Sequence, residues 1–134
     1  MSAMSTYLEN ALASHVLRNT AFTTPGTSIY VGLIKFYETA TLEAGTLTQE
    51  ASGGSYARIQ VTAWDAPSDG ATQNTSAITF ATASADWGNV SGVIVADAAS
   101  AGNVLLHGSL TTARDVKNGD VFKFNAGDLD ITFA

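Results

Sequence analysis

The first pattern along the chain is helical. Between residues 6 and 19, mostly apolar positions recur at intervals of three and four, the spacing of one helix face. Thr6 and Glu9 fit the capping-box pattern of a helix start, and Pro25 cannot continue a helix. The spacing therefore predicts a helix over about 6–19, with its stripe packed on a larger body. That stripe comprises Leu8, Ala11, Leu12, His15, Val16 and Asn19.

After Pro25, short runs rich in β-branched and aromatic residues predict strands. Residues 28–36 are apolar on both faces, which indicates a central strand, and residues 56–64 alternate as in a half-buried strand. Asn118-Gly119 between β-branched residues predicts a hairpin turn. Further strands are expected at 76–80, 90–96, 103–110, 121–125 and 129–133, and loops at 38–55, 65–76 and 81–89.

About seven short strands behind one helix predict a mainly β fold. We expect an antiparallel β-sandwich or jelly-roll-like domain with one N-terminal α-helix, formed by residues 1–134 as a single domain. No second long helix is predicted, so alternating βαβ units are excluded.

The composition of the chain indicates a weakly charged surface. Charged residues make up 13% of the 134 positions, whereas about 25% is usual for soluble domains. Much of the surface must therefore be small and polar or apolar, which favours a subunit that buries part of its exterior against neighbours. The formal net charge of -6 argues against binding nucleic acid or an anionic membrane surface.

The search for catalytic chemistry finds little. The chain has no cysteine and two histidines, of which we expect His15 to pack on the helix stripe and His107 to be a partly exposed strand residue. Asp128 and Asp130 share one strand face, about 7 Å apart by strand rise. Such a pair could bind Ca²⁺ or serve as general acid and base, but a solvated strand face is the favoured interpretation. We expect no enzyme activity, no metal and no cofactor.

Several sequence blocks resemble a family of small virion structural proteins of tailed bacteriophages. One is Ser-Thr-Tyr-Leu-Glu-Asn-Ala-Leu at residues 5–12, and the blocks follow one another over nearly the whole chain. They lie at residues 5–12, 15–22, 29–33, 53–58, 85–88, 103–108, 118–120 and 124–129. The resemblance implies a protein of the virion, assembled in the host cytoplasm, with other virion proteins as partners.

Three functions follow from the resemblance and the residues. The favoured one is a capsid decoration or cement protein, a homo-oligomer that stabilises the head by non-covalent contacts with the major capsid protein. A fibre needs length, which 134 residues without a repeat cannot supply. The alternative is a tail-associated host-adhesion module (tail fibre or tail tip) that binds a host glycan through loops near Trp87 or residues 65–76. A carbohydrate-active enzyme built on Asp128 and Asp130 is the least favoured.

Candidate contact residues are apolar or aromatic. Trp87 could stack on a sugar, although a loop tryptophan before glycine more often closes the end of a β core. The remaining candidates are the helix face and two tyrosines, which could equally be core residues. Together the interface candidates are Tyr7, Leu8, Leu12, Val16, Tyr56 and Trp87.

Overall fold

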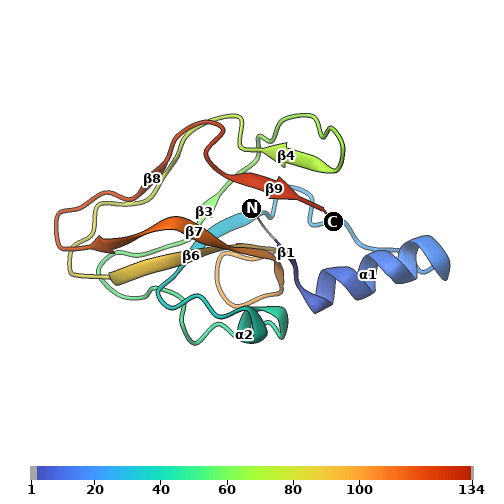
Figure 1. The fold of residues 1–134 in the computed structure, drawn as a ribbon, viewed down its shortest axis with the longest axis horizontal. Coiled ribbons are helices and arrows are strands. Elements are labelled where there is room, and N and C mark those ends of the chain that lie inside the picture. Colours follow the sequence, from blue (N-terminus) through green and yellow to red (C-terminus); the bar gives the residue numbers. More distant parts are fainter. Residues whose placement is uncertain (1–2, 134) are drawn as a thin grey trace.

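A computed structural model describes residues 3–133 of the chain. Its body is a five-stranded antiparallel sheet in the order β1-β7-β6-β2-β3 (Figure 1). These strands are β1 (Ala3–Met4), β7 (Val104–Val116), β6 (Gly88–Ala96), β2 (Tyr30–Ile34) and β3 (Ile59–Gln60). Two further antiparallel ladders pair β4 (Ala71–Gln73) with β9 (Asp130–Thr132), and β5 (Ile78–Thr79) with β8 (Lys123–Phe124). The helices are α1 (Thr6–Leu17) and α2 (Thr39–Glu43).

The large sheet is covered on both faces. Alternate residues of β2 and β6, such as Val31 and Val93, join one core cluster with residues of the two small ladders, such as Phe124 and Ile131. Ile94 faces the opposite side and packs in a second cluster with Leu42 of α2. The mainly β, antiparallel, sandwich-like fold with an N-terminal helix is thus confirmed for the described residues. Residues 1, 2 and 134, which the sequence places in the same domain, lie outside them.

The helix start differs from the prediction by one residue. Ser5, not Thr6, is the N-cap, and its hydroxyl accepts a hydrogen bond from the Leu8 amide at 3.2 Å. The same hydroxyl donates to the Val104 carbonyl of β7. The cap therefore also ties α1 to the sheet, a contact between residues distant in sequence that a local pattern cannot reveal.

The predicted packing of the helix stripe is wrong beyond its first turns. Leu8 is buried and Leu12 half-buried, but Val16 is 73% exposed and Leu17 81% exposed. The helix ends at Leu17, two residues short of Asn19, and its far half projects past the body of the protein (Figure 1). His15 is exposed there and accepts a hydrogen bond from the Phe22 amide at 3.3 Å.

The strand predicted at residues 56–64 is mostly absent. Only Ile59–Gln60 pairs with β2, at the edge of the sheet. Arg58, which the alternation places on the more polar face of that strand, is buried, at 6% exposed. An inward arginine contradicts the simple period-two interpretation, because its ion pair, and not its polarity, decides its direction. The predicted loops at 38–55 and 65–76 also contain α2 and β4, respectively.

At Asn118-Gly119 the chain makes the predicted turn, but the segments on either side of the turn do not pair as a hairpin. Gly119 has a φ of 91°, and the Asp120 amide donates to the Lys117 carbonyl, as in a tight turn. The chain that follows leaves β7, and β8 pairs with β5 instead. Burial of Phe122 and Phe124 explains the choice, because pairing with β5 places both rings in the core.

Candidate functional site

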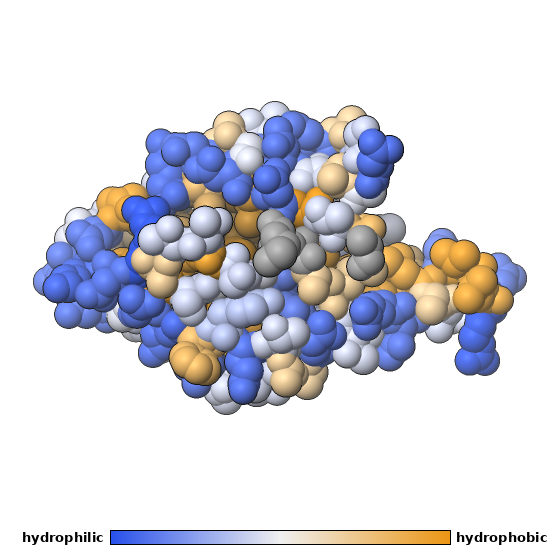
Figure 2. Space-filling view, viewed as in Figure 1, coloured by the Kyte–Doolittle hydropathy of each residue, from blue (hydrophilic) through white to orange (hydrophobic). Residues whose placement is uncertain are grey.

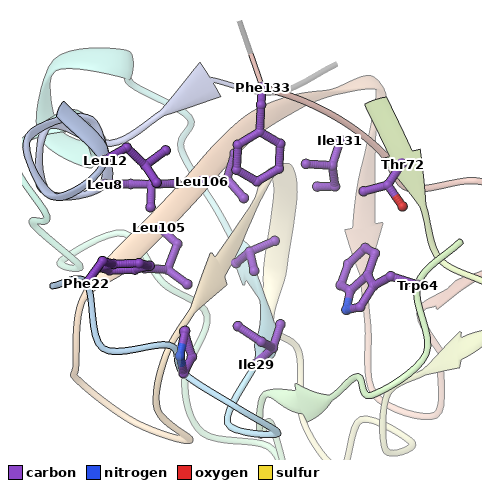
Figure 3. Close-up of a pocket in the computed structure, with 12 residues that line it drawn as sticks. Leu8, Leu12, Phe22, Ile29, Trp64, Thr72, Leu105, Leu106, Ile131 and Phe133 are labelled. Carbon is purple, nitrogen blue, oxygen red and sulfur yellow. The ribbon is translucent and has the colours of Figure 1, made fainter. Parts of the chain in front are cut away.

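An apolar groove opens between α1 and the β4–β9 ladder (Figure 3). Its volume is about 270 Å³. One wall comes from α1 and the segment after it, through Leu8, Leu12, Phe22, Pro25 and Ile29. The sheet contributes Val95, Leu105 and Leu106, and the far side contributes Trp64, Thr72, Ile131 and Phe133.

The groove exists because two separate elements cover one face of the sheet. The β4–β9 ladder packs Ile131 on part of that face, and α1 packs Leu8 on another part. In Figure 3, Leu8 and Leu12 lie on one side of the opening, and Ile131 and Trp64 lie on the other. Thr72 is the one lining residue with a hydroxyl, and it donates to the Asp65 carbonyl at 2.6 Å. The groove therefore suits an apolar occupant.

The structure brings two of the predicted contact residues into this groove, Leu8 and Leu12. Val16 lies exposed at the far end of α1, and Tyr7, 44% exposed, lines a different hollow beside α2. The groove residues missing from the prediction include Phe22, Trp64 and Phe133. Phe133 carried a usable signal, since it continues the alternation of Leu129 and Ile131, whereas nothing local marks Phe22.

Trp87, one of the interface candidates, is enclosed in the core, as the preferred interpretation of its sequence context predicted. It is 2% exposed, and its indole N–H donates to the Gly54 carbonyl at 2.8 Å. Its ring meets that of Tyr56 edge-on, with 5.3 Å between centroids. A side chain enclosed in this way closes the end of the β core and offers no face to a sugar or a neighbouring subunit.

Tyr56 is half-buried and acts within its own chain. Its hydroxyl accepts a hydrogen bond from the Leu33 amide of β2 at 2.9 Å. Burial raises the pKa of Tyr56 far above its ordinary value, and the nearby negative charge of Glu50 adds to the effect. The phenol therefore stays neutral and serves as a hydrogen-bonding group of the core.

His107 is buried, not partly exposed as the sequence suggested. It is 1% exposed, with Nδ1 at 2.8 Å from the Tyr37 hydroxyl and Nε2 at 3.3 Å from Glu43 Oε1. Because Glu43 ends α2, this cluster joins α2 to β7. An imidazole that is enclosed on all sides has no surface to offer a substrate, and its contacts satisfy its own polar atoms.

The aspartate pair also has a local role. Asp128 accepts a hydrogen bond from the Asn125 amide at 2.9 Å, which caps the turn before β9, and Asp130 lies within β9 beside Gln73 of β4. Over residues 3–133, no group of three or more acidic or histidine side chains is placed to hold a metal ion.

A buried ion pair fixes the loops at one end of the sheet. The Arg58 guanidinium contacts Glu50 at 2.8 Å, and their side chains are 2% and 14% exposed. The same guanidinium donates to the carbonyls of Ala98 and Ala101, at 2.7 and 2.9 Å. Arg58 thus links the loop after α2 to the turn between β6 and β7.

These features define a small β-rich protein, whose prominent surface feature in residues 3–133 is an apolar groove. The chain matches the model of the family "Podophage GP4 fiber I protein gp80" over residues 3–132, and it belongs to that family. The expected relationship to virion structural proteins of tailed phages, and the location in the virion, are thereby confirmed. Comparison with curated proteins finds no match. No helix of the described part is long and apolar enough to span a bilayer.

Proposed function

We propose that the chain is a tail-associated structural component of a podophage fibre. The observation that carries this proposal is the family match over residues 3–132, because the family is described as a fibre protein. The same description favours the tail over the head decoration that the sequence suggested. In either position the chain would act through non-covalent contacts with other virion proteins.

The size of the chain limits its part in a fibre. It has 134 residues, and its strands form one layered body without a repeated unit (Figure 1). Repetition or a coiled coil normally supplies fibre length. The chain would therefore be a compact segment, such as a joint or collar, with the length supplied by other chains.

A structural role fits the polar groups better than binding of a host glycan. Three side chains of residues 65–76 bond to one another: Thr75 and Gln73 donate to the Asp65 carboxylate at 2.7 and 2.9 Å. A sugar needs polar groups that are free to exchange hydrogen bonds with it. Trp87, the other glycan candidate, is enclosed. Joining of virion parts is thus the favoured role.

Separation of virion parts tests the proposal. Purified virions would be dissociated into heads and tails, and the chain would be quantified in each fraction against the major capsid protein. We expect it with the tails, at tens of copies or fewer per particle. Recovery with the heads at hundreds of copies would overturn the proposal and return head decoration to first place.

A further inference from the structure

We propose that two copies of this chain pair through α1, so that the end of each helix fills the apolar groove of the other copy. The inserted side chains are Val16 and Leu17. The pairing is a property of the purified chain and does not rest on the proposed tail location.

The end of α1 is apolar and lacks support from its own chain. Val16 and Leu17 are 73% and 81% exposed, and Figure 2 shows apolar side chains gathered at the outer end of the helix. Helices of about 12 residues are marginal in water without packing. In α1 only Leu8 is buried. A second surface that covers Val16 and Leu17 would supply the missing packing.

The groove has the size and lining for such side chains. Its volume of about 270 Å³ exceeds the ~150 Å³ of an engineered apolar cavity that admits benzene. Phe133, at its rim, is 43% exposed, and Phe22 and Trp64 are half-buried. Aliphatic side chains inserted here would remove apolar surface from water on both copies.

The charges beside the two surfaces are opposite. Arg18 follows Leu17 directly, and among residues 3–133 its guanidinium forms no ion pair. Asp65 follows Trp64 at the groove, and hydrogen bonds from Thr75 and Gln73 lower its pKa, so it stays anionic.

A second aspartate lies on the same rim. Asp69 precedes Gly70, whose carbonyl accepts from the Phe133 amide at 2.8 Å. In a chain of net charge -6, most contacts between copies bring like charges together. The end of α1 and this rim are an exception, which favours a second copy as the occupant.

Two copies related by a two-fold axis can make this contact twice, once in each direction. Leu12 of the groove wall and Leu17 of the helix end belong to one helix, about 7.5 Å apart along its axis by helix rise. Two antiparallel α1 helices would therefore place each end over the other copy's groove. Such an interface uses the same surface twice and stops at two copies.

Sedimentation of the purified chain tests the pairing. We expect a concentration-dependent dimer, and we expect Leu17→Glu to raise its dissociation constant at least about tenfold, because a carboxylate would enter an apolar groove. Phe36→Glu is the matched control. Phe36 is 63% exposed but lies outside the groove, so the dissociation constant of the Phe36→Glu dimer should equal that of the wild type. A monomeric wild type, or equal dissociation constants for wild type and Leu17→Glu, would overturn the proposal.

Engineered cysteines test the contact itself, since the natural chain has none. Leu17→Cys and Phe133→Cys would be mixed under mild oxidation. We expect a disulfide-linked species that contains one copy of each, and little of it from Phe36→Cys mixed with Phe133→Cys. Equal yields from the two mixtures would contradict the contact between helix end and groove.

Discussion

At the scale of single residues, Tyr56 substitutes for a missing strand. β3 pairs only with Tyr30 and Val31 of β2, so the Leu33 amide lies beyond its reach. The Tyr56 hydroxyl accepts a hydrogen bond from the Leu33 amide at 2.9 Å, and the Ala51 amide donates one to the Leu33 carbonyl at 2.9 Å. The edge of β2 is thus satisfied by three segments in place of one continuous partner.

The first prediction concerns this hydroxyl. Tyr56→Phe leaves the buried Leu33 amide without an acceptor, which should lower the free energy of unfolding by about 1–3 kcal/mol. Tyr7→Phe removes a hydroxyl from an exposed ring and should change it by less than about 0.5 kcal/mol. Urea unfolding of both variants provides the measurement. Equal stabilities for the two variants would contradict the role given to Tyr56.

The second prediction concerns Asp65, whose pKa lies below its ordinary value because Thr75 and Gln73 donate to the carboxylate. A lowered folded-state pKa stabilises the fold above the unfolded value of about 3.9, and the contribution is lost as pH falls through the lower folded value. Asp65→Asn should therefore be less stable than wild type at pH 5–7, and the gap should shrink towards pH 2–3. Urea midpoints across this range measure it; a gap that is constant with pH would refute the assignment.

At the scale of elements, α1 shows what a local pattern can and cannot predict. Its existence and approximate start follow from the spacing of Leu8, Leu12 and Val16 along the sequence. Its cap does not, because Ser5 is selected by a contact with Val104, 99 positions away. The exposure of Val16 also does not follow from the spacing, because it depends on where the body of the protein ends.

The third prediction separates the observed cap from the expected one. Ser5→Ala removes the acceptor for the Leu8 amide and the donor to Val104, which should cost about 1–2 kcal/mol of stability. Thr6→Ala, at the first helical position, should cost less than about 0.5 kcal/mol. Thermal or urea unfolding compares them, and a larger loss in Thr6→Ala would restore the capping box that the sequence suggested.

Sequence patterns work best where one face alone is buried. Around β9 (Asp130–Thr132) the buried Leu129 and Ile131 alternate with the exposed Asp128 and Asp130, and the strand lies inside the predicted range 129–133. In residues 56–64 the same signal misleads, because Arg58 is drawn inward by Glu50. The groove is still harder to predict from the sequence, because it is lined by α1, β7 and β9, which come together only in the folded chain.

The fourth prediction concerns the ion pair that causes that exception. Arg58→Met leaves Glu50 largely buried without a partner, which should cost about 3–5 kcal/mol. The double variant Arg58→Met with Glu50→Leu removes both charges and should recover more than half of the loss. A double-mutant cycle from urea unfolding measures the coupling, and purely additive losses would show that the two groups do not interact.

At the scale of the whole molecule, the chain is a layered β body with an apolar groove beside a projecting helix (Figure 1). Its buried polar groups, such as Arg58 and His107, bond within the chain and hold loops and α2 to the sheet. The apolar groove and the exposed end of α1 are surfaces open to contact with other chains. That property suits a virion structural protein, the class to which its family belongs.

Imaging of the particle would show where in the virion the chain lies. The chain carrying a small tag at a surface loop would be incorporated into virions, and the tag would be located by asymmetric cryo-electron microscopy. We expect density for this fold at the tail, within or beside the fibres. Density distributed over the head lattice, or none on the particle, would contradict this expectation.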